Sequence, residues 1–492
     1  MANGVRSYQP RIQVTLVKCV KEKNAQAERY VAANNRIDLT PFLSENGSVV
    51  THKDITQPLG TFNITFADQV DRNGRDSRHA DSVYGIVAPM DYVEIRMARS
   101  PVARREDYGQ YLPVIMRGFV SQVRRSQMIG GDGKPVRSVI IEGQDFGKLL
   151  QIMQIFYERN YGLGQNLVTK FLLAQNYAVK FKSFTASDFM RAMIDQIVTP
   201  ELEVLWQESA LSSTIENPMR IRTDGSLTVD DGTVQPYVFQ HYSGNLWGLM
   251  KQFADLNWNE LFIRDDPDGV RLVYRPFPYK DIDGHWIKPG ADPGSTRITL
   301  DDVGAMNVSR SDANVANYFW VDAPHYQAIG PSQNQDFAYS QKENYLMEDY
   351  PNNNPALYGI RKMEATTAQG PSGESTSGVD LDKEGQAKAI GNMWDWLAER
   401  RGRLKAYNKD NVMFEVGDMT LKGNAQVRPG TYLELDLGAF RPEYYAYAVT
   451  QTYVPLREFT TKVAVKRGTG YIQRSRLERS PYRAERGSGV YE

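Results

Sequence analysis

The chain has 492 residues, a length that suggests about three domains. Of these residues 41% are hydrophobic and 24% are charged, which is the composition of a folded protein rather than of a disordered chain. Lys and Arg (58) nearly balance Asp and Glu (59), which excludes an overall electrostatic field that would collect nucleic acid or an anionic membrane. Cys19 is the only cysteine, which excludes an intrachain disulfide and a metal site built from several cysteines.

Residues 1–148 predict a first antiparallel β-barrel domain. Apolar and polar residues alternate in several of its segments, as they do in strands with one buried face: Ile12–Val17, Gly60–Phe66 and Pro113–Val120. The Gly-rich segment Gly130–Pro135 has the composition of a hairpin loop. The charged segment Arg96–Asp107 predicts an exposed loop.

Residues 149–235 predict a helical insert. One helix is expected from Leu149 to Phe156, and a second from Ser187 to Val198, with Ser187 or Asp188 as its cap and Pro200 as its stop. Residues 236–321 then predict an α/β segment, in which a helix over Ser243–Phe253 precedes two strands, Leu261–Arg264 and Val270–Tyr274. The Asp265–Gly269 turn between these strands predicts a hairpin.

Residues 322–384 are rich in Asn, Gln, Ser, Gly and Pro, and predict an irregular arm or linker. Its tyrosines at 339, 345, 350 and 358 could dock the arm on a folded surface, such as a neighbouring subunit. In the alternative interpretation, the segment is only a flexible spacer. A helix is expected over Lys383–Lys405, and residues 385–470 predict a second β-barrel domain. Residues 471–492 form an Arg-rich tail that either docks on an acidic partner or only solubilises the chain.

A three-strand pattern occurs twice, in the same order. The first copy comprises Asp91–Ile95, Gly118–Val123 and Arg137–Gly143, and the second comprises Thr431–Leu435, Tyr447–Thr452 and Thr461–Gly468. The predicted fold class is therefore α+β, mainly β, with two similar small antiparallel β-barrel domains and helical and irregular insertions. Because a ring-forming protein can use two like domains to double its apparent symmetry, the repeat indicates assembly rather than catalysis.

The sequence predicts no catalytic, cofactor-binding or metal site, and hence a protein that is not an enzyme. The five histidines, at 52, 79, 241, 285 and 325, lack the close spacing of a metal site. The segment Gly143–Leu149 is one residue too short for a phosphate loop, so a strand that turns through Gly147 into a helix is expected. The segments Asp266–Gly269 and Asp281–Gly284 lack the distant Glu of a calcium loop, and Cys19 lies in a strand-like run as a small core residue.

Several segments, in this order, resemble one family: Leu59–Phe66, Asp91–Ile95, Arg117–Val120, Val139–Lys148, Trp258–Phe262, Tyr274–Pro278 and Arg467–Gly470. Through them the chain resembles the central hub proteins of contractile-tail bacteriophage baseplates, a family related to the hub portion of type VI secretion spikes. None of these segments is a catalytic signature.

The resemblance implies a homotrimer whose six barrels form a ring between a hexameric tail tube and a trimeric central spike. The ring would leave a channel for the tape-measure protein and DNA, contact other baseplate proteins, and bind no nucleic acid specifically. The implied location is the virion, after assembly in the cytoplasm of the bacterial host, with no membrane insertion because we expect neither a signal sequence nor a spanning segment. No segment after Gly470 is long enough for a fused spike or lysozyme domain. Two alternatives stay open, a cell-wall hydrolase of the tail and the hub of a related bacterial contractile injection system.

Overall fold

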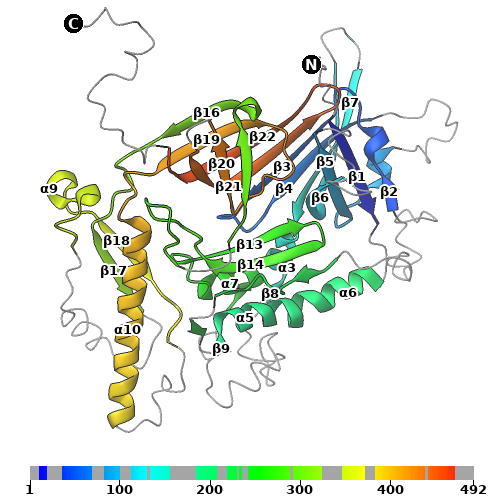
Figure 1. The fold of residues 1–492 in the computed structure, drawn as a ribbon. Helices are drawn as coiled ribbons and strands as arrows, with labels where there is room; N and C mark the ends of the chain where they lie inside the picture. Colours follow the sequence, from blue (N-terminus) through cyan, green and yellow to red (C-terminus); the bar gives the residue numbers. More distant parts are fainter. Residues whose placement is uncertain are drawn as a thin grey trace, which may run out of the picture.

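The computed structural model places most of the chain in one assembly of strands and helices (Figure 1). It describes residues 10–18, 36–68, 82–99, 112–129, 133, 135–155, 184–207, 219–229, 232–234, 242–288, 292–323, 346–371, 383–437 and 441–470. Cys19, His79, His241, His325, Tyr339, Tyr345 and the Arg-rich tail lie outside these residues.

The main feature is a sheet of 13 strands. Eleven of them follow one path, in the order β16-β19-β22-β21-β3-β4-β7-β6-β5-β1-β2, and β15 and β20 pair beside β21. In chain order, the sheet contains β1 (Arg11–Val17), β2 (Arg36–Asp38), β3 (Ser48–Asp54), β4 (Thr61–Ala67), β5 (Tyr92–Ala98), β6 (Val114–Ile129), β7 (Pro135–Asp145), β15 (Ser295–Thr299), β16 (Val303–Ser309), β19 (Glu415–Lys422), β20 (Thr431–Asp436), β21 (Glu443–Val454) and β22 (Glu458–Gly468).

The sequence repeat is a structural repeat. The strands β5, β6 and β7 form one antiparallel meander, and β20, β21 and β22 form another. Each middle strand carries a one-residue bulge, at Ser121 in β6 and at Tyr447 in β21. When β6 and β21 are aligned on these bulges, Gly118 corresponds to Tyr444. The sequence segments had instead matched Gly118 with Tyr447, three residues later. The difference arises because a bulge interrupts the alternation from which the segments were matched.

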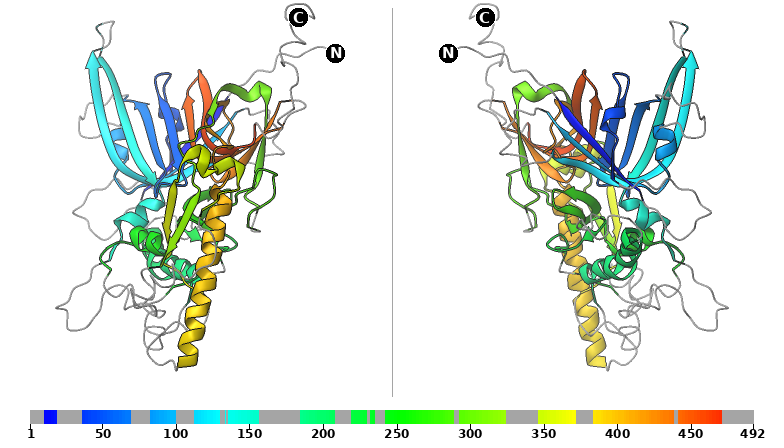
Figure 2. Two further views of the ribbon diagram at one scale, coloured as in Figure 1. Left: turned by 90° about the vertical axis from the view of Figure 1, so that its left-hand side faces the viewer. Right: turned by 90° about the vertical axis from the view of Figure 1, so that its right-hand side faces the viewer.

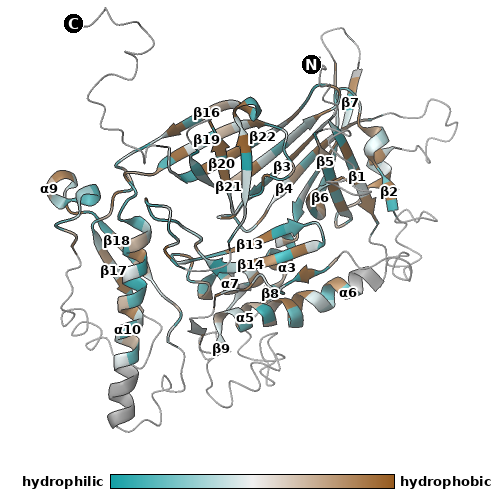
Figure 3. Cartoon of the chain, in the orientation of Figure 1, coloured by the Kyte–Doolittle hydropathy of each residue, from teal (hydrophilic) through white to brown (hydrophobic). Residues whose placement is uncertain are grey.

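The predicted fold class, mainly β with helical insertions, is confirmed. The two meanders, however, belong to one continuous sheet, and no closed barrel is found among the described residues. We call β3, β4, β7 and β6 the first strand unit, and β16, β19, β22 and β21 the second. Figure 2 shows the two groups of strands diverging above the helices. Apolar and polar residues alternate along many strands (Figure 3), and the burial alternates with them in β4 and β22.

Separate apolar cores lie under the two strand units. The first surrounds Phe62, Ile64 and Val120, and the second surrounds Met419, Leu433 and Val463. A third core, built largely of aromatic rings, connects the sheet to the helical part and includes Trp258, Tyr407, Tyr432 and Tyr445. Burying such large rings stabilises the fold by about 1.5–3 kcal/mol per side chain.

Helices lie in the segment that was predicted as a helical insert. It contains α3 (Gly147–Ile152), α5 (Ala186–Met193), a π-helical segment (Ile194–Val198) and α6 (Thr199–Gln207), and α7 (Leu246–Phe253) packs beside it. The cap of α5 is Thr185, which accepts a hydrogen bond from the Asp188 N–H, rather than Ser187 or Asp188. Pro200 does not end the helix, because it lies in the first turn of α6, where a missing N–H costs little, directly after the π turn.

Two further predictions concern strands. The expected hairpin is confirmed as β13 (Asn259–Asp266) and β14 (Gly269–Pro276). The expected loop from Arg96 is wrong at its start, because β5 continues to Ala98 and Arg96 pairs with Glu94.

The remaining elements are short. The short strands are β8 (Gln154–Ile155), β9 (Phe184–Thr185), β10 (Ile221–Arg222), β11 (Thr233–Val234) and β12 (Gly244–Asn245). The short helices are α1 (Val83–Ile86), Thr40–Phe42, Leu300–Asp302 and Pro351–Asn353.

The described part of the predicted irregular arm contains some regular elements. In it, α9 (Pro355–Tyr358) precedes β18 (Lys362–Thr366), which pairs in parallel with β17 (Tyr318–Asp322). The Tyr350 hydroxyl donates a hydrogen bond to Asp410 of the same chain over 2.6 Å. The long helix α10 (Lys383–Asn408) follows, as predicted, and packs against β17. Among the described residues, no helix combines the length and the apolar character needed to cross a bilayer.

Candidate functional site

The two strand units of one chain meet edge to edge, and this junction is the candidate functional site. The carboxyl half of β21 runs beyond β20 and pairs with β3, in a register that places Thr452 opposite Val50 and Val449 opposite Lys53. A side-chain contact of 2.9 Å between His52 Nδ1 and Thr450 Oγ1 reinforces this ladder. The pairing joins residues almost 400 positions apart, and makes the two units consecutive segments of one sheet.

A buried ionic cluster lies beneath the junction. The Lys53 ammonium of β3 is 3.1 Å from an Asp145 carboxylate oxygen at the end of β7, and it also pairs with Asp265 at the end of β13. All three side chains are buried. The cluster therefore joins the first strand unit to the β13–β14 hairpin through charges that water barely reaches.

The charges in this cluster perturb one another. Burial disfavours the charged form of Lys53 and so lowers its pKa. The attraction of Asp265 and Asp145 has a larger effect, and the pKa of Lys53 is therefore above its ordinary value. Burial raises the pKa of Asp145, and the repulsion of Asp265 adds to the rise, whereas Lys53 counteracts it. A lysine that stays protonated is a structural cation here rather than a general base.

A second set of contacts fixes the same hairpin to the sheet. The Arg117 Nε–H of β6 donates to Glu94 over 3.0 Å, and its Nη1–H donates to the Asp266 carbonyl over 2.7 Å. Although burial raises the pKa of Glu94, Arg96 and Arg117 together lower it below its ordinary value. The β13–β14 hairpin is thereby held rigidly against both the Lys53 cluster and β6.

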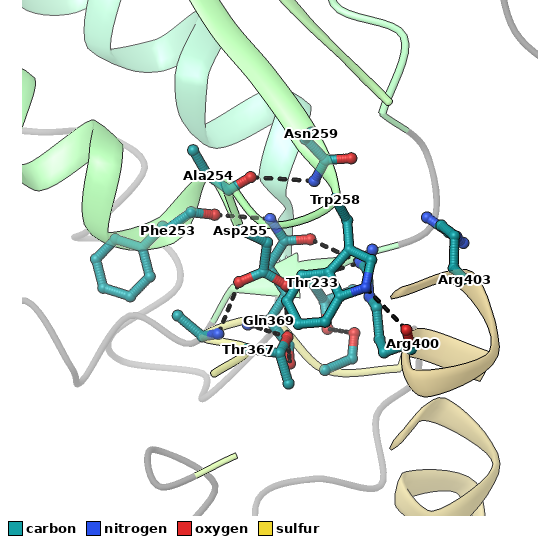
Figure 4. A network of polar contacts seen from close by, with 12 residues as sticks. Thr233, Phe253, Ala254, Asp255, Trp258, Asn259, Thr367, Gln369, Arg400 and Arg403 are labelled. Atoms are coloured by element: carbon teal, nitrogen blue, oxygen red, sulfur yellow. Dashed lines mark hydrogen bonds and ion pairs between the residues drawn. The ribbon is translucent and has the colours of Figure 1, made fainter. Parts of the chain in front are cut away.

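The third set of contacts anchors α10 and is shown in Figure 4. The Arg400 guanidinium is fully buried, 4.1 Å from the ring centre of Trp396 and 3.8 Å from an Asp255 oxygen. The Trp258 ring N–H donates to the Arg400 carbonyl over 2.8 Å. Gln369, from the segment after β18, donates to the Phe253 carbonyl over 2.7 Å, and so closes the network around the helix.

A small cavity lies beside Lys53. It has a volume of about 30 Å³ and is lined by residues of both strand units, Thr51, Lys53, Val449 and Gln451, and by Asp265 of β13. Such a volume accommodates about one water molecule. These lining residues come from β3, β21 and β13, the three elements that meet at the junction.

The motifs considered from the sequence have structural roles in the described part of the chain. As expected, the chain turns from β7 into α3 at Gly147, whose missing Cβ would lie 2.2 Å from the Pro58 carbonyl oxygen. The Lys148 ammonium donates to the Val120 carbonyl over 2.9 Å rather than projecting toward a phosphate. Asp266 and Asp268 of the β13–β14 turn pair with arginines, among them Arg271.

The sequence analysis considered Asp281–Gly284 as a fragment of a calcium loop, but it did not connect His285 with these residues. Asp281, Asp283 and His285 bring three potential ligand atoms within 4.8 Å of one another on an exposed turn. Asp281 accepts hydrogen bonds from the Asp283 and His285 N–H groups, as a turn-forming aspartate does. The turn accounts for this spacing without a metal ion. The Lys53 and Arg400 networks were also missed, because their members come from distant segments.

Comparisons with known proteins complete this description. No family model matches the chain, and no curated protein sequence matches it. Among solved structures, the chain is similar to the tail protein from Neisseria meningitidis MC58, with 9% identity, a TM-score of 0.44 and coverage of 93% of this chain and 97% of that one. It is also similar to the prophage tail protein gp18 from Listeria monocytogenes EGD-e, with 11% identity, a TM-score of 0.40 and coverage of 92% and 94%.

The E. coli c3393 protein, a component of the type VI secretion system, is similar at 8% identity and a TM-score of 0.34, over 85% of this chain and 72% of that one. These similar structures are two phage tail proteins and a component of a type VI secretion system.

Proposed function

We propose that this chain is a structural, non-enzymatic hub of a phage tail baseplate. Three copies would form a ring with pseudo-sixfold symmetry that joins the hexameric tail tube to the trimeric central spike. The channel of the ring would pass the tape-measure protein and DNA, and other baseplate proteins would bind around it. The protein would be assembled in the host cytoplasm and then reside in the virion.

One observation supports this proposal above the others: the chain contains the same strand unit twice, and the two units join edge to edge in one sheet. Two like units per chain give six in a trimer, which is what an adaptor between sixfold and threefold partners requires. The buried Lys53, Arg117 and Arg400 networks support the same function, because the first two hold the first strand unit to the β13–β14 hairpin and the third anchors α10.

The test is the mass of the purified protein by native mass spectrometry, alone and with candidate tube and spike proteins. The proposal predicts a species of about 167 kDa, three times the chain mass of 55.8 kDa. Electron microscopy of that species should show six similar lobes around a central opening. A strict monomer in the presence of both candidate partners would refute the proposal. A peptidoglycan zymogram checks the non-enzymatic part, for which a cleared band would be the contrary result.

A further inference from the structure

An exposed turn, residues 281–286, lies beside the point where the Arg-rich tail leaves the sheet, and we call it the acidic turn. Lys280 directly precedes it. The Lys280 carbonyl accepts a hydrogen bond from the Arg467 guanidinium over 2.6 Å, and the Lys280 ammonium is 2.6 Å from a Glu443 carboxylate oxygen. The Glu443 carbonyl accepts the Thr469 N–H over 3.0 Å. The tail, which starts at residue 471, therefore begins only a few residues from the acidic turn.

The acidic turn presents a carboxylate and an aromatic ring to solvent. Asp281 holds the turn together by accepting two backbone N–H groups, and Asp283 is exposed. The Trp286 side chain is 38% exposed, although tryptophan is mostly buried in folded proteins. Its ring is positioned by Tyr432, with ring centres 5.9 Å apart, and by the Lys280 ammonium, 4.8 Å from the ring centre. An arginine fits such a surface, because its planar guanidinium binds carboxylates and stacks on aromatic rings.

Two further exposed carboxylates, Glu348 and Asp349, lie on the same part of the surface. Burial raises the pKa of Tyr350, and the charge of Asp283 adds to the rise, which places Asp283 near the residue that follows Asp349. The Lys409 ammonium lies over the Tyr350 ring, 4.9 Å from its centre. Within the described ranges, the carboxylates at 283, 348 and 349 form no ion pair. Negative charge thus gathers here without a described cation bound to it.

The complementary charge lies in the adjoining segment of the chain. Residues 471–492 contain five arginines, at 474, 476, 479, 483 and 486, and three glutamates. The four residues from Gly470 to Arg474 span up to about 14 Å when extended, which is enough to bring the first arginines to the acidic turn. A short connection also gives them a high effective concentration at that surface.

We infer that the Arg-rich tail binds the acidic turn of its own chain. Arg474 and Arg476 would pair with Asp283 and with the carboxylates at 348 and 349, and one guanidinium would lie against Trp286. The contact would fasten the end of β22 to the segment around Tyr350. This inference goes beyond the proposed function and does not rest on it, because the contact forms within a single chain.

Trypsin digestion of the full chain tests the inference, because trypsin cleaves after arginine only where the segment is free to enter the protease. Mass spectrometry would follow the first cleavages after Arg474, Arg476 and Arg479. A synthetic peptide of residues 471–492 gives the rate without the acidic turn. Cleavage in the full chain should be at least tenfold slower than in the peptide, and about 1 M salt should remove most of the difference, because it screens exposed ion pairs. Equal rates at low salt would overturn the inference.

Carboxylate variants identify the surface. The triple variant Asp283→Asn, Glu348→Gln, Asp349→Asn should speed cleavage of the tail at least fivefold. The matched control is Asp195→Asn with Glu203→Gln, which removes exposed carboxylates from the helical insert and should leave the rate unchanged. All five positions are exposed, so circular dichroism should match that of the unsubstituted protein. If the triple variant is cleaved no faster than the control, the tail is bound elsewhere and the inference is wrong.

Hydrogen exchange measures the same contact from the other side. Arg474→Gln with Arg476→Gln should accelerate amide exchange in residues 281–286 at least threefold, because the tail no longer covers them. Arg483→Gln with Arg486→Gln removes the same charge farther along the tail and should leave this exchange unchanged. Equal effects of the two pairs would contradict the assignment of Arg474 and Arg476 to the acidic turn.

Dilution distinguishes binding within the chain from binding to another molecule. The protection of the tail from trypsin should stay the same over about a hundredfold dilution, because both partners belong to one chain. Protection that disappears on dilution would overturn the inference and assign the tail to an acidic surface of another molecule. None of these results changes the mass expected for the hub, so the tail contact and the proposed function can fail separately.

Discussion

Replacing Lys53 by Met is the most direct test of the buried cluster beneath the junction. Methionine has nearly the same length and no charge, so the substitution removes the ammonium while filling its space. Asp145 and Asp265 then remain buried without that cation. Breaking a buried ion pair from one side costs about 3–5 kcal/mol, because it leaves an uncompensated charge.

The loss of stability should depend on pH with a definite sign. Burial already raises the pKa of Asp145 in the folded protein, and without Lys53 this pKa rises further. A carboxyl with a raised folded-state pKa destabilises the fold increasingly as the pH rises above its unfolded value. The Lys53→Met variant should therefore be closest to the unsubstituted protein in mild acid and should lose most stability at neutral pH. The Lys53 contribution itself, whose folded pKa is raised, is present below 10.5 and disappears in strong alkali.

The assay is urea unfolding followed by tryptophan fluorescence at several pH values, with Lys53→Met, Asp145→Asn and the double variant. Asp145→Asn can keep the oxygen that accepts the Gly147 N–H, and it leaves Lys53 paired with Asp265, so it should cost less than Lys53→Met. The double variant should cost at least 1 kcal/mol less than the sum of the two. A Lys53→Met protein whose unfolding matches the unsubstituted protein at every pH would refute the reasoning.

Three further predictions concern other contacts. Arg400→Met should lower the free energy of unfolding by about 2–4 kcal/mol in urea, because Asp255 loses a buried cation. Trp258→Phe removes one N–H bond to the Arg400 carbonyl, and should cost about 1–2 kcal/mol in the same assay. Gly417→Ala would place a Cβ 1.9 Å from the Asn307 carbonyl oxygen, so amide exchange along β16 should accelerate, whereas Gly391→Ala, in open space on α10, should leave exchange unchanged.

The fold was predictable where its signal is local. The alternation of apolar and polar residues identified β5 and β20, and the Asp265–Gly269 turn identified the β13–β14 hairpin, because both depend on neighbours in sequence. The bulge at Ser121 was not predictable in this way, since one extra residue interrupts the period without changing the composition. The helix that continues past Pro200 was missed for a similar reason, because the π turn has no period of its own in the sequence.

The junction between the two strand units could not be predicted from the sequence, for a different reason. Its members, Lys53, Asp145 and Asp265, come from three segments separated by more than 90 residues. In the sequence, each of them has the pattern of an ordinary surface charge. Only the pairing of β3 with β21 and the docking of β13 bring them together. The sequence repeat nevertheless predicted two similar units, but it did not predict that they belong to one sheet.

That shared sheet changes what the repeat implies. Two closed barrels would meet through side chains alone, and such a contact has no backbone register. The two open units of this chain join through a strand ladder, which places Val449 opposite Lys53 and so fixes how one unit lies beside the other.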